Sequence, residues 1–487
     1  MTSPNAARSA RGSSRPHRSD RSRGTGAPRR PAASLLADVE TPTTPTPVDH
    51  RSFAELGVRD RLVATLAAAD IVAPFPIQSA TLPDSLTGRD VLGRGQTGSG
   101  KTLAFALPVV SRLADSGNRR TARAPRALVL APTRELARQV EATIAPLAAA
   151  LGQTTALVFG GVSQGSQVVA LRAGVDILVA CPGRLEDLIA QGHISLDKVE
   201  VAVLDEADHM ADLGFLPAVR RLLDQTPAGG QRLLFSATLD NGVDVLVRRY
   251  LVDPVVHAVA HQGSVVTMTH HVFTVAGDDK AEVVRELASG QGRSLLFTRT
   301  RSGAKRLAAQ LTKAGVPAVD LHGDLAQRAR ERNLAAFSSG SVRVLVATDL
   351  AARGIHVDDI ELVVHVDPPA EHKAYVHRSG RTARAGSAGT VVTVATRDQV
   401  REVATLTRRA AIDPTTTAVA PGSAEILALT GPPAAFVEPA PPAPVAAPTR
   451  SSRPRGARSA SASGRPRSST GGAAAPSSRG MSRRRGR

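Results

Sequence analysis

Short apolar runs alternate with longer Ala- and Leu-rich stretches from Phe53 onward. The runs are nearly continuous, which is typical of strands buried on both faces of a parallel sheet. In the first half, the predicted strands are Asp90–Leu92, Ala127–Leu130, Ala156–Phe159, Asp176–Val179, Val201–Leu204 and Leu233–Phe235. In the second half, they are Ser294–Phe297, Ala318–Leu321, Val342–Val346, Leu362–Val366 and Thr390–Val394. Two such series predict an α/β protein with two doubly wound parallel-sheet domains.

The composition changes at both ends of this region. Residues 1–50 are rich in Arg, Ser and Pro, and residues 421–487 are rich in Pro, Ala and Arg. Such segments bury too little apolar surface to fold, so we expect two disordered basic tails. Between them we expect a first domain at 51–258 and a second at 259–420, with the join somewhere in about 250–268.

The formal net charge of +18 is concentrated in the tails. Residues 1–34 hold eight arginines and one acidic residue, Asp20, and residues 449–487 hold eleven arginines and no acidic residue. A solvated, solubilising segment is one interpretation of such tails. With Ser, Gly and Pro interleaved beside a motif-bearing core, they favour nucleic-acid binding.

Cysteine content and hydropathy indicate the compartment. Cys181 is the only cysteine, which excludes an intrachain disulfide and a Cys-based zinc site and suits a reducing cytoplasm. The basic N-terminus is followed by no apolar segment of the signal-peptide kind, and no long uncharged apolar run predicts a membrane span. We therefore expect a cytoplasmic protein with no membrane partner.

Two motifs about a hundred residues apart predict nucleotide hydrolysis. Residues 95–102 read GQTGSGKT, lie between a predicted strand and a helix from Leu103, and fit a phosphate-binding loop. Residues 205–208 read DEAD and follow the apolar run Val201–Leu204, so their carboxylates can hold Mg²⁺ and orient a water. A plain Gly-rich turn and a solvated acidic turn are the alternatives, but the two motifs together disfavour both.

Most other polar motifs also begin where an apolar run ends. Because ligands bind at the carboxyl ends of parallel strands, this repeated placement predicts one extended site in each domain. The motifs are Thr133-Arg134-Glu135, Gly160-Gly161, Pro182-Gly183-Arg184, Ser236-Ala237-Thr238 and Thr348-Asp349.

In this order the motifs closely resemble the DEAD-box ATP-dependent RNA helicases of superfamily 2, of a bacterial generalist type. The resemblance covers about residues 53–395 and implies two tandem RecA-like domains. Besides the motifs above it rests on Phe53 upstream of Pro76-Ile77-Gln78, Pro132 to Ala137, His322-Gly323-Asp324, Ala347-Thr348-Asp349, Ala352-Arg353-Gly354 and residues 377–384, HRSGRTAR.

The resemblance implies ATP and Mg²⁺ as cofactors. Lys101, Asp205 and Glu206 would be catalytic, with Arg381 and Arg384 as arginine fingers reaching the γ-phosphate. Gln78 would read the adenine through its amide, and Phe53 would stack near the base unless it is a core aromatic. The nucleotide-binding set is Phe53, Gln78, Thr97, Gly98, Ser99, Gly100, Lys101, Thr102, Asp349, Gly354 and His356, and the metal ligands are Thr102 and Asp205.

The same resemblance implies coupling and RNA-binding residues. Ser236, Thr238, Asp208 and His377 would couple hydrolysis to strand separation. Hydroxyls, exposed glycine N–H groups and arginines suit phosphate and sugar contacts, which position a strand without reading its sequence. The RNA-binding set is Thr133, Arg134, Gly161, Arg184, Arg299, Gly323, Thr348 and Arg353.

Several residues depart from the family's pattern. Cys181 stands where a threonine is usual, Phe75 replaces a small hydroxyl residue, Ile71 replaces an aromatic, and His356 replaces an aspartate expected near the ribose. Ser379 and Ala383 are milder departures. Because none of them replaces the lysine, the acidic motif or the arginine fingers, we expect activity with weakened nucleotide affinity.

We therefore expect an ATP-dependent RNA helicase that locally unwinds or remodels RNA duplexes and RNA–protein complexes. Its partners would be single-stranded and duplex RNA, with ribosomal particles or RNA-decay machinery as candidate assemblies. An ATP-gated RNA clamp or annealing chaperone, a DNA translocase and an assembly scaffold are the alternatives. The RNA substrate, the pathway and the oligomeric state are not determined by the sequence.

Overall fold

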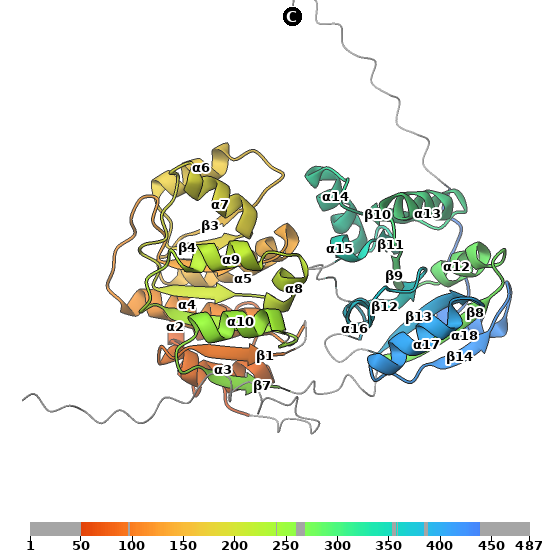
Figure 1. Ribbon diagram of the computed structural model, residues 1–487, viewed down its shortest axis with the longest axis horizontal. Helices are drawn as coiled ribbons and strands as arrows, with labels where there is room; N and C mark the ends of the chain where they lie inside the picture. The colour runs from red at the N-terminus through yellow and green to blue at the C-terminus, as the bar shows by residue number, and fades with distance from the viewer. Residues whose placement is uncertain are drawn as a thin grey trace, which may run out of the picture. The chain divides into compact units, whose positions relative to one another are not determined.

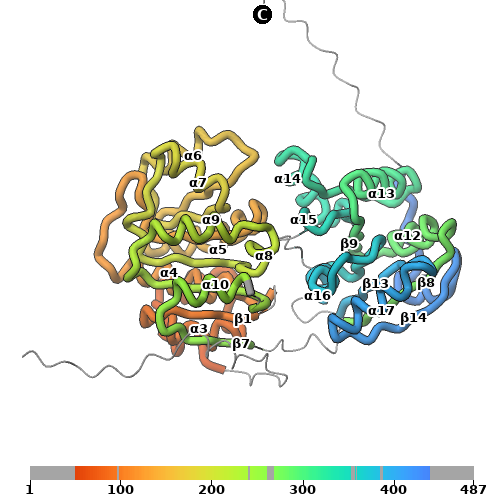
Figure 2. Tube along the Cα trace, in the orientation of Figure 1, coloured from red at the N-terminus to blue at the C-terminus, as the bar shows by residue number. Residues whose placement is uncertain are grey.

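The computed structural model describes residues 50–95, 98–239, 241–259, 268–352, 357, 359–383 and 388–438. Within them the chain forms two seven-stranded sheets whose strands are all parallel. We call residues 50–259 the first lobe and residues 268–438 the second lobe. Helices cover both faces of each sheet (Figures 1 and 2).

The first lobe alternates strands and helices in chain order. Its elements are α2 (Asp60–Ala67), α3 (Pro76–Leu86), β1 (Val91–Arg94), α4 (Lys101–Asp115), β2 (Ala127–Leu130), α5 (Arg134–Ala150), β3 (Thr155–Val158), α6 (Gly165–Ala173), β4 (Ile177–Ala180), α7 (Pro182–Ala190), β5 (Val201–Leu204), α8 (Ala207–Asp212), α9 (Leu216–Leu223), β6 (Gln231–Ser236), α10 (Asn241–Tyr250) and β7 (Val255–Ala258).

The second lobe repeats the alternation. Its elements are β8 (Met268–Val275), α12 (Lys280–Ala288), β9 (Arg293–Phe297), α13 (Arg301–Lys313), β10 (Ala318–Leu321), α14 (Gln327–Ser338), β11 (Val344–Ala347), α15 (Asp349–Ala352), β12 (Ile360–His365), α16 (His372–Ser379), β13 (Gly389–Thr396), α17 (Val400–Arg409), β14 (Thr415–Ala418) and α18 (Ala424–Thr430).

The strand order of the first sheet is β3-β4-β2-β5-β6-β1-β7. Successive side chains along a strand point to opposite faces, so each central strand contributes to two cores. Val129 and Val203 pack with α2 to α5 on one face, whereas Leu128 and Leu204 pack with α6 to α10 on the other. The continuous apolar runs therefore reflect burial on both faces.

The second sheet has the order β10-β11-β9-β12-β13-β8-β14. Renumbered from its own first strand, this is the order of the first sheet. One face packs against α12, α13 and α18, and residues of α14, α15 and α17 cover the other. The two lobes therefore share one topology.

The sequence predicted the central strands well. The strands Ala127–Leu130, Val201–Leu204 and Ala318–Leu321 are confirmed residue for residue, and the other eight overlap observed strands with ends displaced by one or two residues. The helix expected from Leu103 begins at Lys101. Three strands were missed, namely β7, β8 and β14.

The described part of the second lobe extends past residue 420, where the sequence placed its end. Helix α18 buries Ile426 against the core that contains α12. Beyond it, Ala434 N donates to Ser289 O at 2.8 Å and Val437 N donates to Gly315 O at 3.0 Å. The apolar residues of α18 therefore attach to the core a Pro- and Ala-rich segment that composition alone would assign to the C-terminal tail. The remaining tail residues, 1–49 and 439–487, lie outside the described residues.

Candidate nucleotide-binding and RNA-binding sites

The strand order decides which loops meet at the carboxyl edge of the first sheet. Strands β5, β6 and β1 are consecutive neighbours, so the loops that follow Leu204, Ser236 and Arg94 lie side by side. Strands β3, β4 and β2 form the other half of the same edge. Because α/β sheets bind ligands at this edge, the first half brings the phosphate loop to the acidic motif.

The phosphate loop is built on glycines with positive φ. Gly98 has φ of 90° and Gly100 has φ of 86°, a backbone conformation that residues with a Cβ rarely adopt. Lys101 is the first residue of α4 and is buried, and its Nζ donates to Gly95 O at 2.7 Å. Thr102 follows it and is half-buried. The loop thus places a lysine and a helix N-terminus where they can meet phosphate oxygens.

Gln78 joins the start of α3 to the end of this loop. Its Nε2 donates to Gly100 O at 2.8 Å, and its Oε1 accepts from Phe75 N at 2.9 Å. Phe53, the predicted stacking residue, is only 2% exposed and belongs to the apolar core. This burial favours the alternative that Phe53 is a core aromatic, and its stacking role stays a prediction.

The acidic motif turns sharply out of β5. Glu206 has φ of 49°, in the left-handed region, and precedes α8. Burial, reinforced by the charge of Glu206, raises the pKa of Asp205 to about 7. Burial also acts to raise the pKa of Glu206, but the hydrogen bond to His209 and the charge of Lys101 outweigh it and hold the pKa below its usual value. The two neighbouring carboxyls therefore differ: the pKa of Glu206 is lowered, so Glu206 is ionised at neutral pH, whereas the pKa of Asp205 is raised.

His209 supports Glu206 from one turn further along. Its Nδ1 lies 2.9 Å from Glu206 Oε2, and both side chains are buried. The sequence analysis did not assign a role to His209. An acidic residue followed by histidine three positions later on a helix is a weak signal for this contact.

Asp208 links the acidic motif to the loop after β6. One of its carboxylate oxygens accepts from Thr238 N at 2.9 Å and from Thr238 Oγ1 at 3.0 Å, and Asp208 N donates to Ser236 Oγ at 3.3 Å. Ser236 Oγ in turn donates to Thr238 O at 2.7 Å. Three of the four predicted coupling residues are thus in one hydrogen-bond network.

Four predicted RNA-binding residues lie on the other half of this edge. A Cβ at Gly161, where φ is 78°, would lie within 2.5 Å of the Arg134 guanidinium, so the arginine covers this glycine. Arg184 Nη1 donates to Val162 O at 3.3 Å. Thr133 caps α5 by accepting from Leu136 N at 3.2 Å, which gives its hydroxyl a structural partner.

In the second lobe, Arg378 clamps the loop after β11. Its guanidinium bonds both carboxylate oxygens of Asp349, with Nη2 at 2.7 Å, and Nη1 donates to Asp367 O at 2.7 Å. Arg381 is buried, and its Nε donates to the His377 carbonyl at 3.3 Å. The sequence predicted Asp349, His377 and Arg381 but gave no role to Arg378, although it stands within the same arginine-rich motif.

The other predicted second-lobe residues lie at strand ends. Arg299 follows β9, where its N–H donates to Asp367 at 2.8 Å and its Nη2 donates to Pro368 O at 3.4 Å. Thr348 is buried at the start of α15. Gly323 lies beside Arg301, whose Nε would be 3.6 Å from a Cβ at this position. Thr97, Arg353, Gly354, His356 and Arg384 lie outside the described residues.

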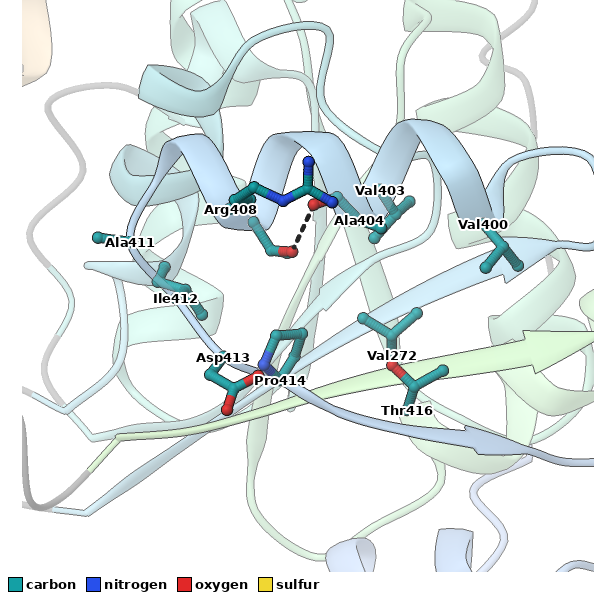
Figure 3. Close-up of a pocket in the computed structure, with 11 residues that line it drawn as sticks. Val272, Val400, Val403, Ala404, Arg408, Ala411, Ile412, Asp413, Pro414 and Thr416 are labelled. Carbon is teal, nitrogen blue, oxygen red and sulfur yellow. Dashed lines mark hydrogen bonds between the residues drawn. The ribbon is translucent and has the colours of Figure 1, made fainter.

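A separate groove of about 480 Å³ lies in the second lobe between α17 and the β8–β14 edge (Figure 3). Val272, Val403, Arg408 and Asp413 are among the residues that line it. None of the predicted site residues lines this groove, so we do not assign the chemistry to it.

Comparisons with known proteins agree with this arrangement. Residues 75–246 match the DEAD/DEAH box helicase model, and residues 279–386 match the model of the helicase conserved C-terminal domain. The ATP-dependent RNA helicase RhlB of Pseudomonas aeruginosa is 41% identical over 342 residues, which are 68% of this chain and 86% of RhlB. The chain belongs to the DEAD-box helicase family. The family predicted from the motifs is thereby confirmed.

Plant members of the family are longer. The chloroplastic DEAD-box ATP-dependent RNA helicase 3A of Zea mays is 44% identical over 370 residues, covering 74% of this chain and 49% of the maize protein. The chain thus spans about half the length of this relative. Among solved structures, Saccharomyces cerevisiae Dbp5 bound to RNA and ADP BeF3 has a TM-score of 0.66 at 28% identity, covering 75% of this chain and 95% of Dbp5. This likeness confirms the predicted fold class of two tandem RecA-like lobes.

Proposed function

We propose that the protein is an ATP-dependent RNA helicase that locally unwinds or remodels RNA duplexes and RNA–protein complexes. The observation that carries the proposal is the carboxyl edge of the first sheet. There the phosphate loop, the ionised Glu206 and the Asp208–Thr238 network are on three adjacent strands. The cofactors would be ATP and Mg²⁺.

The donor set fits Mg²⁺. This ion prefers oxygen ligands, keeps several waters and binds through one or two carboxylates together with substrate phosphates. Asp205 supplies a buried carboxyl whose pKa is raised by burial and by the charge of Glu206, and Thr102 supplies a hydroxyl. Among the described residues no group of three or more His, Cys, Asp or Glu is placed to hold a metal ion. The ion would neutralise charge on the β- and γ-phosphates.

Phosphate binding would change the partner of Lys101. In the structure its ammonium is bonded to Gly95 O, so the loop satisfies its own lysine. A triphosphate offers charged oxygens, which make stronger hydrogen bonds than a neutral carbonyl. Lys101 would therefore turn to the β- and γ-phosphates, while the N–H groups at the start of α4 hold the same anion.

Glu206 would position the attacking water. Its pKa below the usual range keeps it ionised at neutral pH, so its carboxylate can accept a hydrogen bond from the attacking water. The contact with His209 fixes its orientation. Arg381, with Arg384, would reach the γ-phosphate from the second lobe and spread its developing charge. Arg378 and Asp349 would hold the preceding helix α16 in place for that contact.

RNA would lie on the other half of the first-lobe edge. Arg134 and Arg184, at the Gly160–Val162 loop, offer guanidinium groups for phosphates, and these contacts carry no base information. Arg299, Gly323, Thr348 and Arg353 would contribute from the second lobe. The Asp208–Thr238 network would transmit the state of the acidic motif to the RNA-bound lobe.

A cytoplasmic location and ribosomal or RNA-decay partners are part of the proposal. A similar protein from Yarrowia lipolytica, 40% identical to this chain over 346 residues, is the ATP-dependent rRNA helicase RRP3. Among the described residues no helix is long and apolar enough to cross a membrane.

The test is ATP hydrolysis by the purified full chain with single-stranded RNA, with matched DNA and without nucleic acid. We expect stimulation by RNA alone, lost in Glu206→Gln, together with unwinding of a short RNA duplex. Stimulation by DNA would favour a DNA translocase. If Lys101→Ala and Glu206→Gln remodel RNA as well as the parent protein, the clamp or chaperone alternative is correct. Unchanged association with ribosomal particles after removal of both tails would exclude the scaffold.

A further inference from the structure

Phe75 is an exposed aromatic residue beside the phosphate loop. It immediately precedes α3, and 51% of its surface is accessible, whereas Phe53 is 2% exposed. Most of the large apolar side chains in the first lobe are buried in its two cores. A half-exposed phenyl ring next to a ligand-binding loop is a candidate for burial by the ligand.

The ring lies against the last glycine of the loop. A Cβ placed on Gly100 would be 2.6 Å from Phe75 Cδ2 and 3.2 Å from Phe75 Cβ. The same hypothetical Cβ would be 2.5 Å from Gln78 Nε2. Only glycine allows this approach, and its φ of 86° also excludes other residues. Phe75, Gln78 and Gly100 thus form one closely packed unit directly before Lys101.

Gln78 holds this unit together. Its amide oxygen accepts from Phe75 N and its amide nitrogen donates to Gly100 O. The backbone of Phe75 is therefore anchored to the loop by the same amide that would read the base, and its ring packs on Gly100 beside that amide. Polar recognition and apolar surface come from residues three positions apart on one segment.

We propose that Phe75 forms an apolar wall for the base of the bound nucleotide. The inference rests on the proposed ATP-binding function and deepens it. Every nucleobase has an aromatic face, so contact with a phenyl ring raises affinity without distinguishing one base from another. Selection of adenine over guanine is then left to the Gln78 amide. The hydroxyl residue usual at this position in the family is replaced here by a group that binds the base non-selectively.

The first experiment uses Phe75→Trp in the full chain. The natural sequence has no tryptophan, so the substituted residue is the sole source of tryptophan fluorescence. We expect ATP and GTP to change the emission on binding, because each places a base against the indole. Tripolyphosphate, which fills the loop but has no base, leaves the emission near its starting value. Equal changes with all three ligands would overturn the proposal.

The second experiment compares affinities in Phe75→Leu, which keeps an apolar side chain but removes the aromatic face. We expect ATP and GTP to bind about 3- to 10-fold more weakly, by the same factor, with tripolyphosphate unchanged. The matched control is Val72→Ala, three residues earlier, where a side chain that is 76% exposed is removed with no effect on any of the three ligands.

Two results separate this inference from the proposed function. A loss of tripolyphosphate affinity equal to the loss of ATP affinity would show that Phe75 only shapes the loop, and would overturn the proposal that Phe75 contacts the base. A loss of ATP affinity with GTP affinity unchanged would also contradict the proposal. RNA-stimulated hydrolysis by Phe75→Leu at saturating ATP would show in either case that the helicase proposal stands.

Discussion

The two lobes have the same strand order but different chemistry at corresponding positions. Helices α4 and α12 follow the corresponding strands β1 and β8, and they begin at Lys101 and Lys280. Strands β5 and β12 also correspond; Asp205 directly follows β5, and Asp367 lies two residues past the end of β12. A lysine and an acid therefore recur at the same two places of one topology.

Their surroundings differ. Lys101 follows a glycine loop and donates to its carbonyl, whereas Lys280 follows Asp278 and Asp279 and lies 3.8 Å from Asp367. Burial lowers the pKa of Lys280, while the charge of Asp367 acts in the opposite direction. Acidic residues before the second lysine repel phosphate, and Gly277, the one glycine between β8 and α12, lacks the positive φ that Gly98 and Gly100 have in the phosphate loop. The comparison teaches that local residues at strand ends, rather than the fold, determine the site.

The largest expected effect comes from the two equivalent lysines. Lys101→Ala removes a contact to the β- and γ-phosphates and should lower RNA-stimulated hydrolysis about 100-fold or more. Lys280→Ala removes a partly buried ion pair far along the chain from the phosphate loop and should change the rate less than about threefold. Rates at saturating ATP and RNA check this difference. Equal losses in two folded variants would mean that the second lysine also serves catalysis.

The next comparison concerns one buried arginine in each lobe. Arg126 bonds Glu200 at 2.8 Å and Leu113 O at 2.6 Å, and Arg378 bonds Asp349 and Asp367 O. Replacing either by alanine leaves a carboxylate or carbonyl without its partner and should lower the free energy of unfolding by about 3 kcal/mol. Urea denaturation measures this.

Activity separates the two arginines. Arg126 lies at the amino edge of its sheet, so folded Arg126→Ala should hydrolyse ATP normally, whereas Arg378→Ala should be impaired because α16 is displaced. The control is Arg301→Ala, which breaks a pair with Asp324 that is 60% and 62% exposed, for an expected change under about 1 kcal/mol. A normal rate in Arg378→Ala would refute the positioning role of this arginine.

Acid should destabilise the second lobe through two histidines, the half-buried His270 and the buried His365. Burial lowers the pKa of His270 to about 4, and burial with the charge of Arg378 lowers the pKa of His365 well below its usual value. Below the ordinary histidine pKa of 6.5, the unfolded chain binds more protons than the folded protein. The free energy of unfolding therefore falls as the pH drops from 6.5 towards 4.

Urea midpoints across this pH range should reveal the effect. His365 Nδ1 lies 3.0 Å from Thr393 Oγ1, so His365→Asn offers a polar group there without the titration and should flatten the pH dependence. An unchanged slope in that variant would contradict the assignment to His365.

The smallest effect concerns Cys181, which is in the first lobe. Burial, with the charge of Glu135, raises the pKa of its thiol to about 12, so little reactive thiolate is present at neutral pH. We expect slow alkylation of the native protein that accelerates in urea as the first lobe opens. As the sole thiol, Cys181 then reports that lobe alone. Rapid alkylation without denaturant would show that the lobe opens locally around α7.

The sequence predicted the central strands because they are apolar on both faces. It missed β7, β8 and β14 for physical reasons. β8 contains His270 and His271, β14 reads TTTA and is mostly exposed, and β7 is half-buried at an edge. Polar or half-exposed strands lack the continuous apolar signal and are recognised only through their pairing with neighbours.

Motif positions at the site were predictable, but contacts were not. The phosphate loop and acidic motif follow strands, so their meeting at one edge follows from a parallel sheet. The bond between His209 and Glu206, the bond from Lys101 to Gly95 O and the position of Phe75 on Gly100 depend on backbone turns with positive φ. Such turns bring side chains together at distances that spacing along the chain does not determine.

The position of β1 has a consequence for synthesis on the ribosome. This strand pairs with β6 through Val91 and Leu233 and with β7 through Val91 and Val255, so both neighbours are made much later. At a rate of about 5–20 residues per second, the first strand waits on the order of ten seconds for them. During that time its apolar residues have no sheet to join, and the nascent chain has no complete nucleotide pocket. Newly made protein can therefore bind ATP only after the whole first lobe has emerged.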